Sequence, residues 1–119
     1  MRTDRSALRK IDIGTSRLEE MARFYREVFK FELAAGESQG CRTFNFRLEG
    51  LEISLAEDPE MKPGMGNHQF HVEVPDPNAI LNRAKSAGYN TQEAGEEALT
   101  RAYVWDPDGN PWGLRLLGS

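Results

Sequence analysis

Hydrophobic and polar residues alternate through the stretch RKIDIGT, residues 9–15. Every second residue of such a stretch falls on the same side of an extended chain, which is typical of a strand with one buried face. The residues on the buried side are Ile11, Ile13 and Thr15.

The next stretch, residues 16–33, carries its apolar residues at the spacing of a helix. They are Leu18, Met21, Tyr25 and Val28. This spacing predicts an amphipathic helix whose apolar stripe packs on the sheet. Ser16 and Glu19 have the spacing of a capping box, which predicts where the helix begins.

The rest of the first half predicts one hairpin between two polar segments. Residues 34–40, AAGESQG, indicate a polar loop or turn. Residues 41–50 and 51–58 predict two antiparallel strands that are joined at Glu49-Gly50. Residues 57–67, EDPEMKPGMGN, contain two prolines and two glycines and are interpreted as a linker.

The same order of elements follows in the second half. Residues 68–74, HQFHVEV, alternate as a strand does. Asp76 is predicted to cap a helix that has Pro77 at its first position and ends near Gly88. The remaining strands are predicted over residues 89–95, 100–105 and 111–117, with the turn DPDGN between the last two.

The two halves match when one is shifted by 59 residues along the other. Ile11 then falls on Phe70, and Ile53 falls on Trp112. An internal repeat of one βαβββ unit explains this match. We therefore predict an α+β fold of two βαβββ modules, at about 8–57 and 68–117, in one domain over residues 1–119. The alternative is a general α+β domain whose periodicity arose by chance.

Composition excludes several classes of partner. The 119 residues carry a net charge of −4 with no run of Lys or Arg, so we expect no nucleic-acid or membrane partner. No apolar run approaches the roughly 20 residues of a membrane-spanning helix. The N-terminal segment lacks the apolar stretch of a signal peptide, and Cys41 is the only cysteine. We expect a cytoplasmic protein.

Three motifs point to a known family. FYREVFKFEL ends the first predicted helix, SAGY ends the second, and DPDGNPWGL lies near the C-terminus. Together they resemble the glyoxalase/bleomycin-resistance/extradiol-dioxygenase group, the vicinal oxygen chelate superfamily, from about Leu8 to Leu117. The resemblance implies a cupped cavity formed by the sheets of paired modules, and a homodimer. Lys30 departs from the family, which usually has glycine at this corner, as Gly88 is in the second half.

The resemblance also assigns four positions to the metal ligands of metal-dependent members, two in each module. In this sequence they are Lys10, Ser54, Gln69 and Gly113. Lysine is normally a cation, neutral serine is a poor ligand and glycine has no donor, so only Gln69 resembles a ligand. We therefore expect no metal and no cofactor. Gly113 either removes a metal-binding carboxylate and leaves room, or merely lets Trp112 pack.

The cup implied by the resemblance has further wall residues on the same faces of its strands. We expect the ligand to contact Lys10, Asp12, Glu52, Ser54, Gln69, His71, Trp105, Gly113 and Arg115. One of Phe44 and Phe46 is expected to join Trp105 in the cavity, whereas Trp112 is expected in the core. Alternatively, a metal site shifted by one pleat would use Asp12, Glu52 and His71.

Three functions remain open from the sequence. The favoured one is a metal-independent binding protein that sequesters an aromatic drug or metabolite, with no catalytic residues. The alternative is a lyase, epimerase or dioxygenase that uses the shifted metal site, or a metal-free enzyme with His71 or Glu73 as general base. The third is an interaction module whose dimer surface carries its role.

Overall fold

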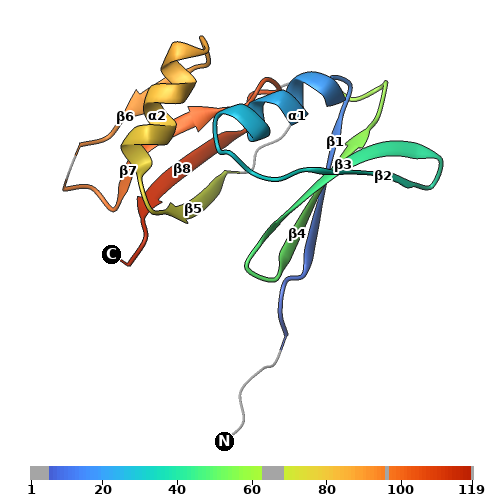
Figure 1. The fold of residues 1–119 in the computed structure, drawn as a ribbon, viewed down its shortest axis with the longest axis horizontal. Coiled ribbons are helices and arrows are strands. Elements are labelled where there is room, and N and C mark those ends of the chain that lie inside the picture. Colours follow the sequence, from blue (N-terminus) through green and yellow to red (C-terminus); the bar gives the residue numbers. More distant parts are fainter. Residues whose placement is uncertain (1–5, 63–68, 96, 119) are drawn as a thin grey trace, which may run out of the picture.

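The chain folds into two βαβββ modules, one after the other (Figure 1). The computed structural model describes residues 6–62, 69–95 and 97–118. The first module comprises β1 (Lys10–Thr15), α1 (Leu18–Glu27), β2 (Ala34–Ser38), β3 (Cys41–Leu48) and β4 (Leu51–Glu57). The second comprises β5 (Phe70–Val74), α2 (Pro77–Ser86), β6 (Thr91–Glu93), β7 (Thr100–Trp105) and β8 (Pro111–Leu116). The predicted α+β class is confirmed.

Each module forms its own four-stranded mixed sheet, in the orders β1-β4-β3-β2 and β5-β8-β7-β6. The first and last strands of a module run parallel, and its other neighbours run antiparallel. The 59-residue shift holds in the pairing as well. Ile11 pairs with Ile53 as Phe70 pairs with Trp112. The repeat seen in the sequence is therefore a repeat of strand register.

The helix-facing sides of both sheets cover one hydrophobic core. The predicted stripe of α1 is confirmed, because Leu18, Met21, Tyr25 and Val28 are all buried. Trp112 is also buried, as expected. The expectation that Phe44 or Phe46 faces a cavity with Trp105 is wrong. Their register with Leu55 and Ile53 puts both phenylalanines on the helix-facing side, where Phe46 is buried and Phe44 is partly buried.

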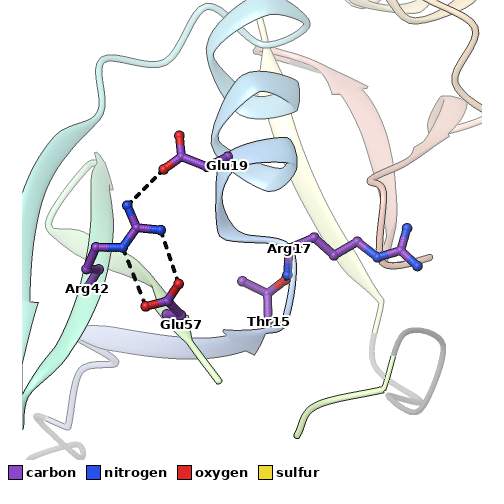
Figure 2. Close-up of polar contacts among 5 residues, drawn as sticks. All are labelled: Thr15, Arg17, Glu19, Arg42 and Glu57. Carbon is purple, nitrogen blue, oxygen red and sulfur yellow. Dashed lines mark hydrogen bonds and ion pairs between the residues drawn. The ribbon is translucent and has the colours of Figure 1, made fainter. Parts of the chain in front are cut away.

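The predicted capping box at the beginning of α1 is wrong. The N-cap residue is Arg17, and no side chain caps it. Instead, the Thr15 hydroxyl accepts a hydrogen bond from the Arg17 backbone N–H at 3.0 Å (Figure 2). Glu19 does not reach back toward the helix start, because its carboxylate binds the Arg42 guanidinium at 3.0 Å. Arg42 also binds Glu57 at 3.1 Å, so one guanidinium ties α1 to β3 and β4.

Helix α1 ends at Glu27, earlier than the periodicity predicted. Lys30 has φ of 64°, in the left-handed region that ends helices. The Phe31 backbone N–H then donates to the Tyr25 carbonyl at 3.2 Å. In the second module Gly88 has the same role, with φ of 87°. The two corners are therefore alike in conformation although one holds a lysine.

The segment 34–40, predicted as a loop, contains β2. This strand pairs with β3 at the edge of the first sheet, and all of its residues are exposed. Gln39 and Gly40 both have positive φ, which is the geometry of a two-residue hairpin turn. An exposed edge strand has no buried face, so its sequence lacks the alternation that reveals a strand. The predicted turn at Glu49-Gly50 is confirmed, again with two positive φ values.

The modules meet on the helix side of their sheets. The Tyr25 hydroxyl donates to Asp106 in the β7–β8 turn at 2.5 Å and accepts from Trp112 Nε1 at 2.9 Å. Arg83 of α2 donates to the Val28 carbonyl at 2.8 Å. Because both sheets cover one core with their helix-facing sides, their opposite faces point away from that core and from each other.

The described helices include none that is long and apolar enough to cross a membrane. The helix cap predicted at Asp76 is confirmed, since its carboxylate accepts the Ala79 N–H at 3.1 Å. His68 and residues 63–67 of the expected linker lie outside the described residues.

Candidate functional site

The nine residues predicted to contact a ligand all lie on the sheet faces that point away from the helices, here called the open faces. Strand register puts Lys10, Asp12, Glu52 and Ser54 on the first open face. It puts His71, Trp105, Gly113 and Arg115 on the second, with Gln69 beside His71. The prediction identified the right sides of the strands, but it placed both groups in one cavity. Within a single chain the two groups do not face each other.

The first open face is polar, and its charges are matched. Lys10 Nζ lies 3.4 Å from Asp12 Oδ1. Arg47 Nη2 lies 3.6 Å from Glu52 Oε1. Ser54 lies beneath these groups and is only 2% exposed. This face therefore offers hydrogen-bonding groups with little unbalanced charge.

The second open face is organised around His71, whose ring lies over Gly113. A Cβ atom at residue 113 would come within 2.5 Å of His71 Nδ1. The missing side chain of Gly113 is thus the space that the imidazole occupies. His71 Nε2 lies 3.1 Å from Gln69 Oε1, and His71 Nδ1 lies 3.3 Å from the Thr100 hydroxyl. Contacts at both ring nitrogens hold the imidazole in place.

Two further aromatic rings continue this face. The Tyr103 ring lies edge-on to His71, with 6.1 Å between ring centroids. Trp105 follows at 6.2 Å from Tyr103, with an angle of 42° between the ring planes. Both side chains are partly exposed. The three rings form a row, here called the aromatic row, whose planes are inclined to one another and which offers aromatic surface to a ligand.

A groove of about 620 Å³ lies between the segment that follows α1 and the neighbouring parts of β2, β3 and β4. Phe31 and Phe46, stacked with 4.8 Å between ring centroids, form part of its wall. Glu52 is the predicted site residue that lines it. The remaining lining residues are Lys30, Glu32, Ala34, Asn45 and Arg47.

The polar network between the modules is buried and distinct from both open faces. Burial raises the pKa of Tyr25 well above the ordinary value for tyrosine, and the Asp106 carboxylate raises it further. Burial also raises the pKa of Asp106, although hydrogen bonds from Tyr25 and Asn110 act to lower it. Asp106 accepts hydrogen bonds from the Asn110 backbone and side chain at 2.9 and 2.8 Å. The DPDGN turn therefore serves to hold the modules together.

Sequence reasoning did not find Asn45, Arg47 and Thr100, and it counted Tyr103 among the aromatic residues of a candidate pocket without choosing it for the site. Asn45 and Arg47 alternate with Phe44 and Phe46, so they belonged to the open face once those phenylalanines were assigned to the core. Tyr103 alternates with Trp105 and was open to the same argument. Thr100 was hidden by a register shift between residues 100 and 102, which breaks the alternation along β7.

The described residues include no group of three or more His, Cys, Asp or Glu side chains that could hold a metal ion. Asp12 and Glu52 share the first open face, whereas His71 belongs to the second sheet. One chain therefore does not assemble the alternative metal site from these three side chains.

The chain has two βαβββ modules, and the first and last strands of each module pair in parallel. Together with the DPDGN turn before the last strand, these features define the class of glyoxalase-like folds. The chain belongs to the Glyoxalase/Bleomycin resistance protein/Dioxygenase superfamily, which matches residues 7–114. This confirms the resemblance expected from the sequence. A comparison with curated proteins found no match.

Solved structures with the same fold include proteins of different function. TnmS3, an antibiotic binding protein from Streptomyces sp. CB03234, is 25% identical with a TM-score of 0.71, over 97% of this chain and 98% of its own. A glyoxalase family protein from Enterococcus faecalis is 16% identical with a TM-score of 0.70, over 93% and 98%. A mutant of the fosfomycin resistance protein FosX from Listeria monocytogenes, in complex with Mn(II), is 19% identical with a TM-score of 0.68, over 92% and 91%.

Proposed function

We propose that this protein binds small molecules that carry a flat aromatic ring, without a metal ion. The observation that carries the proposal is the aromatic row of His71, Tyr103 and Trp105 on an open sheet face. Ligand sites combine apolar and aromatic walls with a few placed polar groups, as this face does. The antibiotic binding protein TnmS3, similar along nearly the whole of both chains, supports a binding role.

The donor atoms of one chain do not fit a catalytic divalent ion. Such an ion needs about three oxygen or nitrogen ligands and an open position. Gly113 offers none, and the His71 ring takes the space beside it. The Lys10 ammonium brings positive charge to another of the four positions, and Gln69 Oε1 is engaged by His71. We therefore propose binding without metal, and the metal-dependent lyase, epimerase or dioxygenase remains the alternative.

We further propose that two copies pair, so that the first open face of one chain covers the second open face of the other. A ligand on one sheet face alone would stay half exposed, whereas binding sites usually bury 70–90% of a ligand. The charge-matched first open face suits the far wall of such a cup. The cytoplasmic location expected from the sequence remains a prediction.

The test is a screen of flat aromatic drugs and metabolites by thermal shift, followed by calorimetric titration. We expect at least one compound to stabilise the protein, by about 2.7 kcal/mol at a hundred times its Kd. Trp105→Ala should weaken this binding, because it removes one ring of the row. Leu117→Ala is the matched control, since Leu117 is exposed beyond the end of β8.

Three results would count against the proposal. Binding that Trp105→Ala leaves unchanged would place the ligand elsewhere. A light-scattering mass of one chain would overturn the pairing of copies. Near-stoichiometric zinc, nickel, iron or manganese, by elemental analysis of protein purified without chelator, would favour the metal-dependent alternative.

A further inference from the structure

Among the described residues of the open faces, Arg115 is the cation that has no ion-pair partner. Lys10 and Arg47, on the first open face, each lie within 4 Å of a carboxylate of their own module. Arg115 makes one hydrogen bond, from Nε to the Thr100 hydroxyl at 3.4 Å. Among the described residues no carboxylate forms an ion pair with it, and Glu73, its register neighbour on β5, is not within that distance. Most of the five donors of this guanidinium are therefore available to a ligand.

Thr100 connects Arg115 to His71 through hydrogen bonds. Arg115 can only donate, so the Thr100 oxygen accepts from it, and the same hydroxyl lies 3.3 Å from His71 Nδ1. The Gln69 carbonyl oxygen accepts from the other ring nitrogen. The Arg115 guanidinium is therefore adjacent to the aromatic row, at its His71 end.

The register fixes the distance between the cation and the rings. Arg115 pairs with Thr100, Gly113 with Tyr103, and Pro111 with Trp105. Arg115 and Trp105 therefore lie at opposite ends of the face, separated by four residues of strand, or roughly 13 Å. A bicyclic ring on Tyr103 and His71 would bring an attached carboxylate to the guanidinium.

We propose that the second open face selects planar aromatic ligands that carry an anionic oxygen group, with the rings on the aromatic row and the anion on Arg115. The proposal rests on the proposed function and narrows its ligand class. A planar guanidinium binds a carboxylate through paired hydrogen bonds, which also fixes the orientation of the ring plane. The net charge of −4 disfavours anions in general, so this local cation has to supply the attraction.

The experiment compares 2-naphthoate with 2-naphthamide, two probes that share a ring system and differ in charge. Calorimetric titration of the full chain, in its own oligomeric state, gives both dissociation constants. We expect naphthoate to bind roughly ten- to a hundredfold more tightly, the range for a hydrogen bond to a charged group. Arg115→Gln should remove the preference, and Arg115→Lys should retain part of it.

Arg101→Gln is the matched control, because Arg101 belongs to the neighbouring strand β7 but lines a hollow beside α2 with Asp76 and Glu93. It should leave the preference unchanged. Equal binding of the two probes by the unaltered protein would overturn the inference, as would a preference that survives Arg115→Gln. If Trp105→Ala still weakened the binding of both probes in that case, the proposed function would stand, and only the preference for anionic ligands would be refuted. If neither probe bound, the proposal of anionic aromatic ligands would be overturned. The wider screen of aromatic compounds would then test the proposed binding function.

Discussion

Gly113 shows how one residue can determine the chemistry of a strand face. With no Cβ, it lets the His71 ring lie over the sheet, where a side chain at residue 113 would otherwise stand. Both explanations offered for this glycine concerned what it removes or relieves. The structure shows that the vacated space is occupied by another side chain of the same face.

Gly113→Ala is expected to displace His71 rather than to unfold the protein. The new Cβ would meet His71 Nδ1 at 2.5 Å and Thr100 Cγ2 at 3.0 Å. Because the imidazole is exposed and can swing away, we expect the free energy of unfolding to fall by less than about 1.5 kcal/mol. Ligand binding should weaken, since the ring leaves the aromatic row.

The double variant His71→Ala with Gly113→Ala provides the control. Its loss of binding should be smaller than the sum of the two single losses, because both changes remove the same ring. Strictly additive losses, measured by titration, would show that Gly113 acts independently of His71.

Lys30 makes a second prediction at the scale of one residue. Its φ of 64° is a conformation that costs a residue with a Cβ about 1–2 kcal/mol, and glycine avoids this strain. Lys30→Gly should therefore raise the free energy of unfolding in urea by about 1 kcal/mol after its greater unfolded-state entropy is subtracted. Lys30→Ala keeps the Cβ and should give no such gain. Equal effects of both variants would contradict the strain argument.

At the scale of elements, the contact between α1 and the β7–β8 turn depends on Tyr25. Tyr25→Phe removes a donor to Asp106 and an acceptor for Trp112 Nε1, and both partners are buried. We expect a loss of about 2–3 kcal/mol, because each buried group loses a partner. Tyr103→Phe is the matched control on an open face and should change stability little. A small loss for Tyr25→Phe in chemical unfolding would mean that apolar packing alone holds the modules.

The same tyrosine predicts how stability depends on alkaline pH. Its pKa is raised in the folded state, so between the unfolded and folded values the folded chain holds a proton that the unfolded chain has released. Stability should therefore fall as pH rises above about 10, the ordinary tyrosine value. Tyr25→Phe should remove this part of the decline, which urea titrations at a series of pH values can measure.

The elements that the sequence revealed are those with one buried face. Alternation identified β1 and β5, and helical spacing identified α1, because a periodic pattern records which side meets the core. The edge strand β2 has no buried side and was missed. The beginning of α1 was misplaced because Arg42, distant in sequence, competes for Glu19. Neither fact can be read from a local pattern.

At the scale of the whole molecule, the sequence identified the two open faces but not their relation to each other. The alternation of side chains along each strand assigned all nine candidate residues to the correct sides of the sheets. Which modules face each other depends on Tyr25, Trp112 and Asp106, which join the helix sides of the sheets across more than 80 residues of sequence. A pairing that distant leaves no periodic signal, so the sequence left open whether the modules pair within one chain or between chains.

Because the two open faces of one chain point apart, the proposed dimer should show complementation between two inactive chains. Asp12→Trp would block the first open face, and Trp105→Ala would weaken the second. In a mixed dimer of these variants, both defects fall in one cup and the other cup is intact. Random mixing makes half of the dimers mixed, so about one quarter of the cups should recover full affinity. A cup built within each chain would recover none.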